Sequence, residues 1–293
     1  MEHKSGFVNI IGNPNVGKST LMNTLVGERL SIITAKSQTT RHRILGIVSD
    51  DDYQIVYSDT PGIIKPGYKL QESMMKFISI ALRDADIILY VTDVIESYEK
   101  NIDYIERVKK TGVPVLVLIN KIDLSNQEEV VELINAWKVL IPHAEIIPIS
   151  ATKKFQLGIV QDRIKALLPE GPAFYPKDQL TDKTERFFVS EIIREKILIH
   201  YKEEVPYSVE VEITEFKEEE RLIRIYAVIY VVRESQKGIV IGHQGRMLKK
   251  VGTQARLDME EFFDKKVFLQ LEVKVSKNWR DNSGELKNFG YDN

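Results

Sequence analysis

Short apolar runs alternate with helical patterns through the first 170 residues of this chain. The apolar runs cover residues 7–11, 43–49, 53–58, 86–93, 113–120 and 144–150. The helical patterns lie near 18–27, 70–83, 99–110, 127–140 and 156–168. Strands that alternate with helices in this way form a mostly parallel sheet wrapped by helices. The pattern therefore predicts an α/β domain.

Proline and glycine interrupt the chain after the last of these helices. The breaking residues are Pro169, Gly171, Pro172 and Pro176, and no regular element is expected across them. We therefore expect a first domain over residues 1–170, a linker over 171–181 and a second domain with a C-terminal tail over 182–293.

The second domain follows a different pattern. A helix is expected over 182–203, strands over 208–216 and 221–232, helices near 235–241 and 245–263, and a strand over 266–275. Alternation in the first strand places Val209 and Val211 on the buried face and Glu210 on the opposite face. The α-β-β-α-α-β order predicts a smaller α+β domain.

Composition excludes several classes of protein. The 293 residues contain no cysteine, which excludes a disulfide scaffold, a cysteine nucleophile, thiolate zinc sites and iron–sulfur clusters. The formal net charge is −2, so no general positive field indicates nucleic acid. No window approaches eighteen uncharged apolar residues, so no membrane span is predicted. A reducing cytosol is the expected location.

A phosphate-binding motif lies between the first strand and the first helix. It reads Gly12-Asn13-Pro14-Asn15-Val16-Gly17-Lys18-Ser19 and matches G-x-x-x-x-G-K-[ST] in the context that this motif requires. Backbone N–H groups and the helix N-terminus can hold phosphates there. Lys18 is expected to reach the β- and γ-phosphates and Ser19 to bind Mg²⁺. We include Thr20 in the binding set.

Three further polar segments each follow a strand. Asp59-Thr60-Pro61-Gly62 is either an ordinary turn or a site where Asp59 holds Mg²⁺ and Gly62 contacts a γ-phosphate, with Ile63 beside it. Asn120-Lys121-Ile122-Asp123 is either a polar helix cap or a guanine site, in which Asp123 accepts from N1–H and the amino group. Ser150-Ala151-Thr152 could contact guanine O6. Ligands bind at the carboxyl ends of strands in such sheets, so the four segments together favour guanine nucleotide binding.

Residues 6–168 resemble the translation-factor-related class of small GTPases. The resemblance implies that 36–43 form switch I, with Thr40, or less favourably Thr39, joining Mg²⁺ when a γ-phosphate is present. Ile63 stands where Ras-like proteins carry a water-orienting glutamine, so water must be placed by other means. The resemblance also implies that Asn15 helps to hold K⁺ near the phosphates. The expected catalytic set is Lys18, Thr40, Gly62 and Asn15.

A Gly-X-X-Gly loop is the most informative feature of the second domain. It is either a glycine-capped helix–turn–helix or the loop with which KH domains clamp single-stranded nucleotides. Five basic residues and no acidic one lie between Ser235 and Leu257. With the predicted element order, the loop resembles that of a type II KH domain. The expected RNA-binding residues are Lys237, Ile239, Val240, Ile241, Gly242, His243, Gln244, Gly245, Arg246, Met247, Lys249 and Lys250.

The whole chain resembles the Era family of bacterial ribosome-biogenesis GTPases. The matching stretches are GNPNVGKSTLMN, QTTRHRILGI, YSDTPGI, SEIIREKI, PYSVEVEI and VIGHQG. The resemblance implies a monomeric GTP-hydrolysing switch that binds the 3′ end of 16S rRNA during 30S assembly, and a peripheral contact with the inner membrane. The alternatives are a nucleotide kinase, which need not select guanine, and a second domain that docks a protein instead of RNA.

Overall fold

The chain divides into two compact units. The computed structural model describes residues 3–97 and 100–291. The first unit comprises Met1–Pro66 and Met74–Asp182, and the second comprises Gly67–Ser73 and Lys183–Asn293. The first residue of the helix expected over 99–110 lies outside the described residues.

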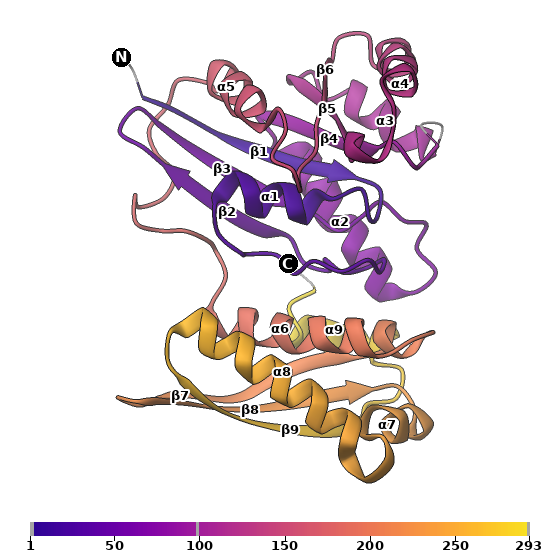
Figure 1. The fold of residues 1–293 in the computed structure, drawn as a ribbon, viewed down its shortest axis with the longest axis vertical. Helices are drawn as coiled ribbons and strands as arrows, with labels where there is room; N and C mark the ends of the chain where they lie inside the picture. Colours follow the sequence, from indigo (N-terminus) through magenta and orange to yellow (C-terminus); the bar gives the residue numbers. More distant parts are fainter. Residues whose placement is uncertain (1–2, 98–99, 292–293) are drawn as a thin grey trace. The chain divides into compact units, whose positions relative to one another are not determined.

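A six-stranded sheet of order β2-β3-β1-β4-β5-β6 forms the first unit (Figure 1). All neighbouring strands are parallel except β2 and β3, which are antiparallel. The strands are β1 (Lys4–Gly12), β2 (Ile44–Ser49), β3 (Tyr53–Asp59), β4 (Ile87–Asp93), β5 (Val115–Asn120) and β6 (Glu145–Pro148). The helices are α1 (Lys18–Val26), α2 (Lys69–Arg83), α3 (Ile102–Lys109), α4 (Gln127–Leu140) and α5 (Leu157–Leu167), and the start of α2, up to Ser73, is assigned to the second unit. The predicted α/β fold is confirmed.

The central strands explain why the sequence pattern is so clear. Every residue of β4 and β5 is buried, as expected for parallel strands covered on both faces. Their continuous apolar runs end at Asp93 and Asn120, and β1 and β3 end at Gly12 and Asp59. Because these four strands are mutually parallel, the polar segments that follow them meet at one edge of the sheet.

The proline-containing segment 171–182 lies against the first unit. Thr181 forms an isolated antiparallel bridge with Gly46 of β2, and the Ile47 N–H donates to the Leu180 carbonyl at 2.8 Å. The buried Gln54 side chain accepts from the N–H groups of Phe174 and Tyr175 and donates to the Tyr175 carbonyl. The predicted linker is therefore tied to the edge of the first sheet.

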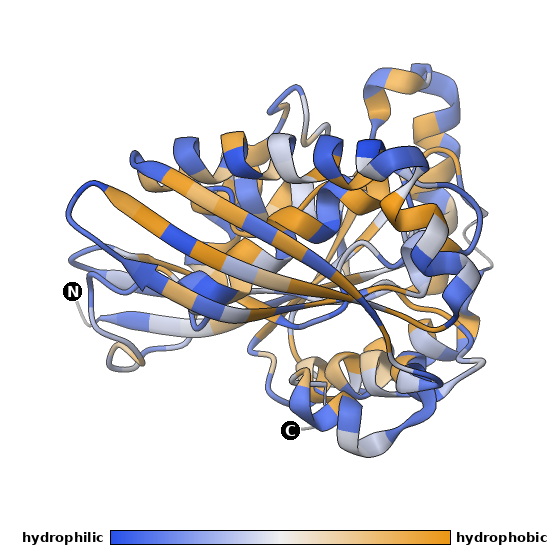
Figure 2. Ribbon diagram, turned by 90° about the horizontal axis from the view of Figure 1, so that it is seen from below, coloured by the Kyte–Doolittle hydropathy of each residue, from blue (hydrophilic) through white to orange (hydrophobic). Residues whose placement is uncertain are grey.

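The second unit places helices on one face of a three-stranded sheet of order β7-β8-β9. Strands β7 and β8 are antiparallel and β8 and β9 are parallel. Hydrophobic and hydrophilic segments mix along these strands (Figure 2). The elements are α6 (Glu185–His200), β7 (Glu210–Glu218), β8 (Leu222–Val231), α7 (Glu234–Ile241), α8 (Arg246–Phe263), β9 (Lys266–Val275) and α9 (Ser283–Asn288). The predicted α-β-β-α-α-β order is confirmed, with α9 added.

The C-terminal segment changes the environment of β7. The Trp279 ring is fully buried and its Nε1 donates to the Ser208 carbonyl at 3.1 Å. The Tyr291 hydroxyl donates to Glu210 Oε2 at 2.7 Å. Val209 and Val211 are buried as predicted, but Glu210 is only 6% exposed. The face opposite Val209 and Val211 is therefore covered at Glu210, because Tyr291 of the C-terminal segment contacts this side chain. Within the described residues, no helix is long and apolar enough to cross a membrane.

Candidate nucleotide and nucleic-acid sites

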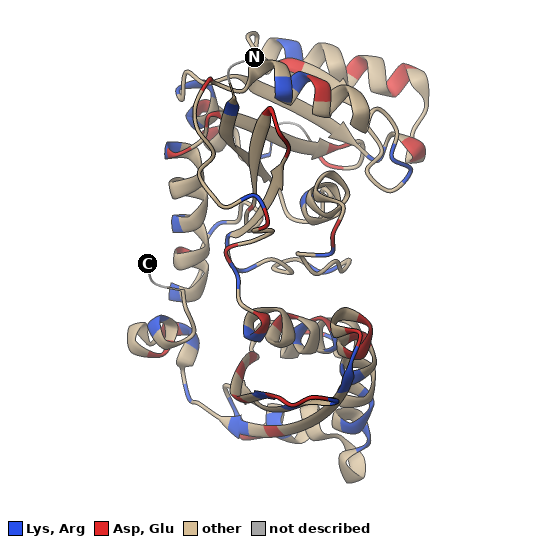
Figure 3. Ribbon diagram, turned by 90° about the vertical axis from the view of Figure 1, so that its left-hand side faces the viewer, with Lys and Arg blue, Asp and Glu red and all other residues tan. Residues whose placement is uncertain are grey.

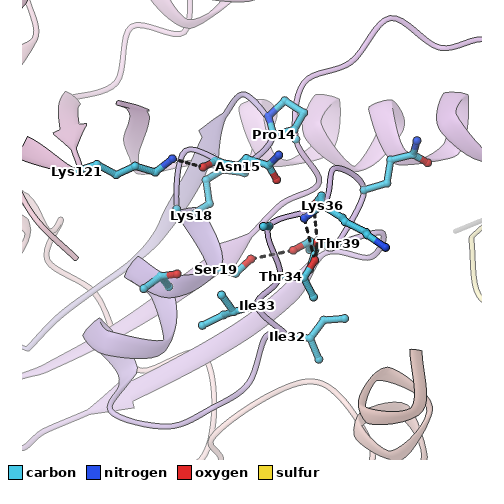
Figure 4. Close-up of a pocket in the computed structure, with 16 residues that line it drawn as sticks. Pro14, Asn15, Lys18, Ser19, Ile32, Ile33, Thr34, Lys36, Thr39 and Lys121 are labelled. Carbon is cyan, nitrogen blue, oxygen red and sulfur yellow. Dashed lines mark hydrogen bonds between the residues drawn. The ribbon is translucent and has the colours of Figure 1, made fainter. Parts of the chain in front are cut away.

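The phosphate-binding loop lines one side of a cavity of about 410 Å³. Residues 32–36 and 38–40, together with Gly62 and Lys121, line the rest of it (Figure 4). At the end of the loop, Gly17 has φ 95°, and a Cβ there would lie 2.3 Å from Asn120 Nδ2. Only glycine fits this combination of backbone angle and close approach. The loop geometry therefore depends on the residue that the sequence motif specifies.

Lys18 brings a positive charge to the wall of the cavity. Its Nζ donates to the Asn13 carbonyl at 2.7 Å, and the side chain is buried. Burial lowers the pKa of Lys18 to about 8, although the charges of Asp59 and Glu96 oppose this shift. A buried ammonium at the start of a helix is suited to binding a polyanion such as a phosphate chain.

Ser19, Thr40 and Asp59 bring three oxygen atoms together. Asp59 Oδ2 accepts from Ser19 Oγ at 2.6 Å and from Thr40 Oγ1 at 3.3 Å. The two hydroxyls are 2.9 Å apart. Thr39 instead pairs with Thr34 and donates to the Lys36 carbonyl. Burial raises the pKa of the Asp59 carboxyl, whereas the Ser19 hydrogen bond and the charge of Lys18 lower it.

This oxygen cluster fits a hard divalent cation. Oxygen ligands of this kind suit Mg²⁺, which also keeps water or substrate phosphate in its coordination shell. Asp59 Oδ1 is buried and makes no hydrogen bond of ordinary geometry within the described residues. No group of three or more His, Cys, Asp or Glu side chains that could hold a metal occurs among those residues. A cation here would therefore depend on the hydroxyls and on phosphate oxygens.

Asn120 connects the two segments predicted to bind guanine, Asn120–Asp123 and Ser150–Thr152, to the phosphate loop. Its Nδ2 donates to the Val16 carbonyl at 2.8 Å, and its Oδ1 accepts from the Ala151 N–H at 3.0 Å. The neighbouring Lys121 Nζ donates to the Asn15 carbonyl at 2.6 Å (Figure 4). Asp123 follows in an exposed single turn of 3₁₀ helix, Ile122–Leu124. The structure thus brings three of the four predicted segments together through one amide side chain.

The segment after β3 brings glycine, and not isoleucine, to the cavity. A Cβ on Gly62 would lie 2.7 Å from the backbone of Pro14, so the two segments are in close approach. The Ile63 N–H donates to the Gly12 carbonyl at 3.1 Å. Its side chain is 1% exposed and does not line the cavity. Ile63 thus packs in the core, although it was expected in the binding set.

The Gly-X-X-Gly loop joins α7 to α8 in the second unit. Gly242 has φ 71°, and a Cβ there would meet the Met247 side chain at 2.7 Å. His243 and Gln244 are exposed between the glycines. Val240 is fully buried and its carbonyl accepts from the Tyr201 hydroxyl. These contacts anchor the end of α7, directly before the loop, in the core of the unit. The exposed side chains of the predicted RNA-binding set are Ile239, His243, Gln244, Arg246, Lys249 and Lys250.

A second cavity of about 380 Å³ continues from this loop between α8 and β9. Most residues that line this cavity were not predicted from the sequence, and they include Thr253, Arg256 and Gln270. Gly252 was the available signal, because an isolated glycine inside a helix often marks a close approach. A Cβ on Gly252 would lie 3.2 Å from Leu271 Cδ1 of β9. Figure 3 shows that both basic and acidic residues occur along the ribbon of this unit.

The two units define a P-loop GTPase domain joined to a KH domain. A family model for 50S ribosome-binding GTPases matches residues 7–121, and one for KH domains matches 204–280. GTPase Era of Clostridium kluyveri is 46% identical over 290 residues, which cover 98% of this chain and 99% of that protein. The Syntrophus aciditrophicus protein of the same name is 46% identical over 291 residues, 98% of this chain and 95% of its own. The chain belongs to the Era family of GTPases.

Solved structures of Era proteins have the same fold over the whole chain. One is Era in complex with MgGDPNP and a fragment of 16S ribosomal RNA, at 39% identity and a TM-score of 0.94, covering 99% of both chains. Another is an Aquifex aeolicus Era variant bound to GDP and AlF₄⁻, also at 39% identity and 0.94, covering 98% of this chain and 99% of that one.

Proposed function

We propose that this protein is a GTP-hydrolysing switch that binds the 3′ end of 16S rRNA and assists assembly of the 30S subunit. The observation that carries the proposal is the full-length match to a relative that was solved with both MgGDPNP and a 16S rRNA fragment. The GTPase domain covers residues 1–170 in this proposal, the linker 171–181 and the KH domain 182–293.

Phosphates bind along the loop from Gly12 to Thr20 in this proposal. Lys18 faces the β- and γ-phosphates, and the oxygens of Ser19, Thr40 and Asp59 hold Mg²⁺. The metal neutralises charge on the phosphate oxygens when it is bound. Within this chain, Asp59 orients both hydroxyls, because its Oδ2 accepts from each of them.

Guanine is read at Asp123 in this proposal. Its side chain is exposed and lies three residues after Asn120, whose amide contacts the phosphate loop. There the carboxylate can accept from guanine N1–H and the exocyclic amino group. Adenine offers no donor at those positions, so a site built this way rejects it strongly. The third segment, Ser150 to Thr152, lies beside the base in this proposal, because the Ala151 N–H donates to Asn120 Oδ1.

Hydrolysis in this proposal proceeds without a glutamine, because position 63 carries an isoleucine, whose side chain is buried. Gly62 offers its N–H to the γ-phosphate, and the exposed Asn15 side chain at the cavity rim would help to hold K⁺. We expect faster turnover in KCl than in NaCl, and loss of that difference in Asn15→Ala. Steady-state phosphate release at matched ionic strength measures it. Equal rates for the unaltered protein in both salts would remove Asn15 from the mechanism.

Single-stranded RNA lies across the Gly-X-X-Gly loop and the α8–β9 groove in this proposal. The glycines let phosphates approach the main chain, and unstacked bases can enter the adjacent cavity. Lys249 and Arg256 line that cavity and supply positive charge. Because ribosomal RNA is the proposed partner, we place the protein in the cytoplasm, and a monomeric state stays an expectation. A peripheral inner-membrane contact stays an expectation from the resemblance.

Two binding assays test this function. Titration with fluorescent GTP and ATP analogues should show strong preference for guanine, whereas a nucleotide kinase need not show it. Filter binding of a 16S 3′-end oligonucleotide should weaken steeply with added salt. Failure to bind RNA at low salt would favour the protein-docking alternative for the second domain.

A further inference from the structure

The end of β4 and the connection to α3 reach the phosphate loop at two points, once through Lys121 and once directly. Asp93 Oδ2 pairs with Lys121 Nζ at 2.5 Å, and the same ammonium donates to the Asn15 carbonyl. Asp93 Oδ1 accepts from the N–H groups of Ile95 and Glu96 at 3.0 and 2.9 Å. These hydrogen bonds turn the chain directly after β4 and fix the position of the Glu96 backbone.

The second point of contact is the Asn13 side chain, which is 2% exposed. Its Nδ2 donates to Glu96 Oε2 at 2.9 Å, and its Oδ1 accepts from Asn101 Nδ2. An amide that is engaged at both ends has only one orientation. The Asn13 backbone carbonyl in turn accepts from Lys18 Nζ at 2.7 Å. A chain of contacts therefore runs from Glu96 to the catalytic lysine.

We propose that Glu96 is a positioning residue for nucleotide binding, which acts through Asn13 on the phosphate loop and Lys18. This inference rests on the proposed nucleotide function. Glu96 is well placed for such a role because Thr92 Oγ1 lies 3.4 Å from its other oxygen and Lys100 Nζ lies 4.0 Å away. Burial raises the pKa of Glu96 and the nearby Asp93 adds to this, whereas Asn13, Lys100 and Lys18 oppose it.

Glu96→Ala should weaken GDP and GTP binding together. Removing the acceptor leaves the buried Asn13 amide without its partner, which costs roughly tenfold in affinity at the energies typical of hydrogen bonds to charged groups. GDP affinity is the deciding measurement, because it reports binding alone and does not depend on any effect of Lys18 on the chemical step. Glu96→Gln should retain most of the affinity, since its amide oxygen can still accept from Asn13.

Matched variants separate positioning from general damage. Glu106→Ala on α3 removes an exposed glutamate paired with Lys109 and should leave nucleotide affinity unchanged. In a double-mutant cycle, adding Glu96→Ala to Asn13→Ala should cost little more than Asn13→Ala alone. Thermal melting of the nucleotide-free proteins checks folding. If Glu96→Ala does not fold, Asn101→Ala tests the same amide from its other end and should weaken both nucleotides severalfold.

Three results would overturn the inference while leaving the proposed function intact. These are unchanged nucleotide affinity in a folded Glu96→Ala or Asn101→Ala variant, additive losses in the cycle, and a Glu96→Gln variant as weak as Glu96→Ala. Failure of the unaltered protein to bind any guanine nucleotide would instead refute the proposed function, and the inference with it. Isothermal titration with GDP distinguishes these cases.

Discussion

At the scale of single residues, the buried ammonium of Lys18 makes nucleotide binding sensitive to pH. Its folded-state pKa of about 8 lies below the ordinary 10.5, so the free protein loses this proton as the pH rises through 8. Bound phosphates favour the charged form, so binding above pH 8 requires proton uptake. We expect the GDP dissociation constant to rise roughly tenfold between pH 7 and 9.

Titration of Lys18→Met over the same pH range is the control for this dependence. The variant keeps the residues proposed to bind guanine but has no ammonium that can take up a proton. Its GDP dissociation constant should therefore be higher and should not change with pH over this range. A parallel decline in both proteins would assign the pH dependence to another group.

Asp123 offers a test of base reading at the same scale. Asp123→Asn should weaken GTP binding and favour xanthosine triphosphate, whose 2-oxo group can accept from the new amide. Competition between the two nucleotides against a fluorescent analogue measures the switch. Since Asp123 is exposed, folding should be unaffected. Unchanged GTP preference would mean that the base binds elsewhere.

A residue's role could be predicted where a short sequence motif encodes it, and not where it depends on contacts with distant segments. Lys18, Ser19 and Asp59 carry motif positions at strand ends, so their convergence follows from a parallel sheet. Glu96 and Glu210 belong to no motif, and their surroundings come from segments distant in sequence. Strand alternation places Glu210 on the face opposite Val209 and Val211, but it says nothing of what covers that face.

At the scale of elements, the Gly-X-X-Gly turn between α7 and α8 can be tested by charge. Replacing His243 and Gln244 by aspartates puts two negative charges where RNA phosphates should lie, against a few kcal/mol of stacking and phosphate contacts. Both side chains are exposed, and Gln244 has φ 52°, which aspartate tolerates. We expect RNA binding, and any RNA stimulation of hydrolysis, to be lost while GTP binding survives.

The matching pair of alanine replacements separates charge from the loss of side-chain contacts. It should retain most of the RNA affinity in a filter-binding assay at fixed salt. Wild-type affinity in a folded double-aspartate variant would show that this loop is only a turn.

Elements were predictable where periodicity is long and strong. The strand expected over 266–275 coincides with β9, and the helix expected over 127–140 coincides with α4. Helix α9 has only six residues, which is too few for a 3.6-residue period to stand out. Its position depends on tertiary contacts of Trp279 and Tyr291 that no local pattern encodes.

At the scale of the whole molecule, Gln54 ties the proline-containing segment to the first unit. Gln54→Ala would leave two backbone N–H groups and one carbonyl of Phe174 and Tyr175 without their partner. We expect the free energy of unfolding of the first unit to fall by about 2 kcal/mol. Urea denaturation of the full chain measures this.

The comparison variant for this prediction is Lys177→Ala in the same segment. It removes an ion pair with Asp51 in which both side chains are largely exposed, so the free energy of unfolding should stay within the error of the measurement. Equal effects of the two variants would mean that Gln54 does not hold the segment.

The same tie has a consequence for self-association. Strands β2 and β6 are the two edges of the first sheet, and an open edge is a template on which another chain can add a strand. Strand β6 has only four residues and offers little length for such pairing. Strand β2 is longer, but its Gly46 and Ile47 already pair with Thr181 and Leu180. The segment that connects the two domains thus also shields the first from edge-to-edge aggregation.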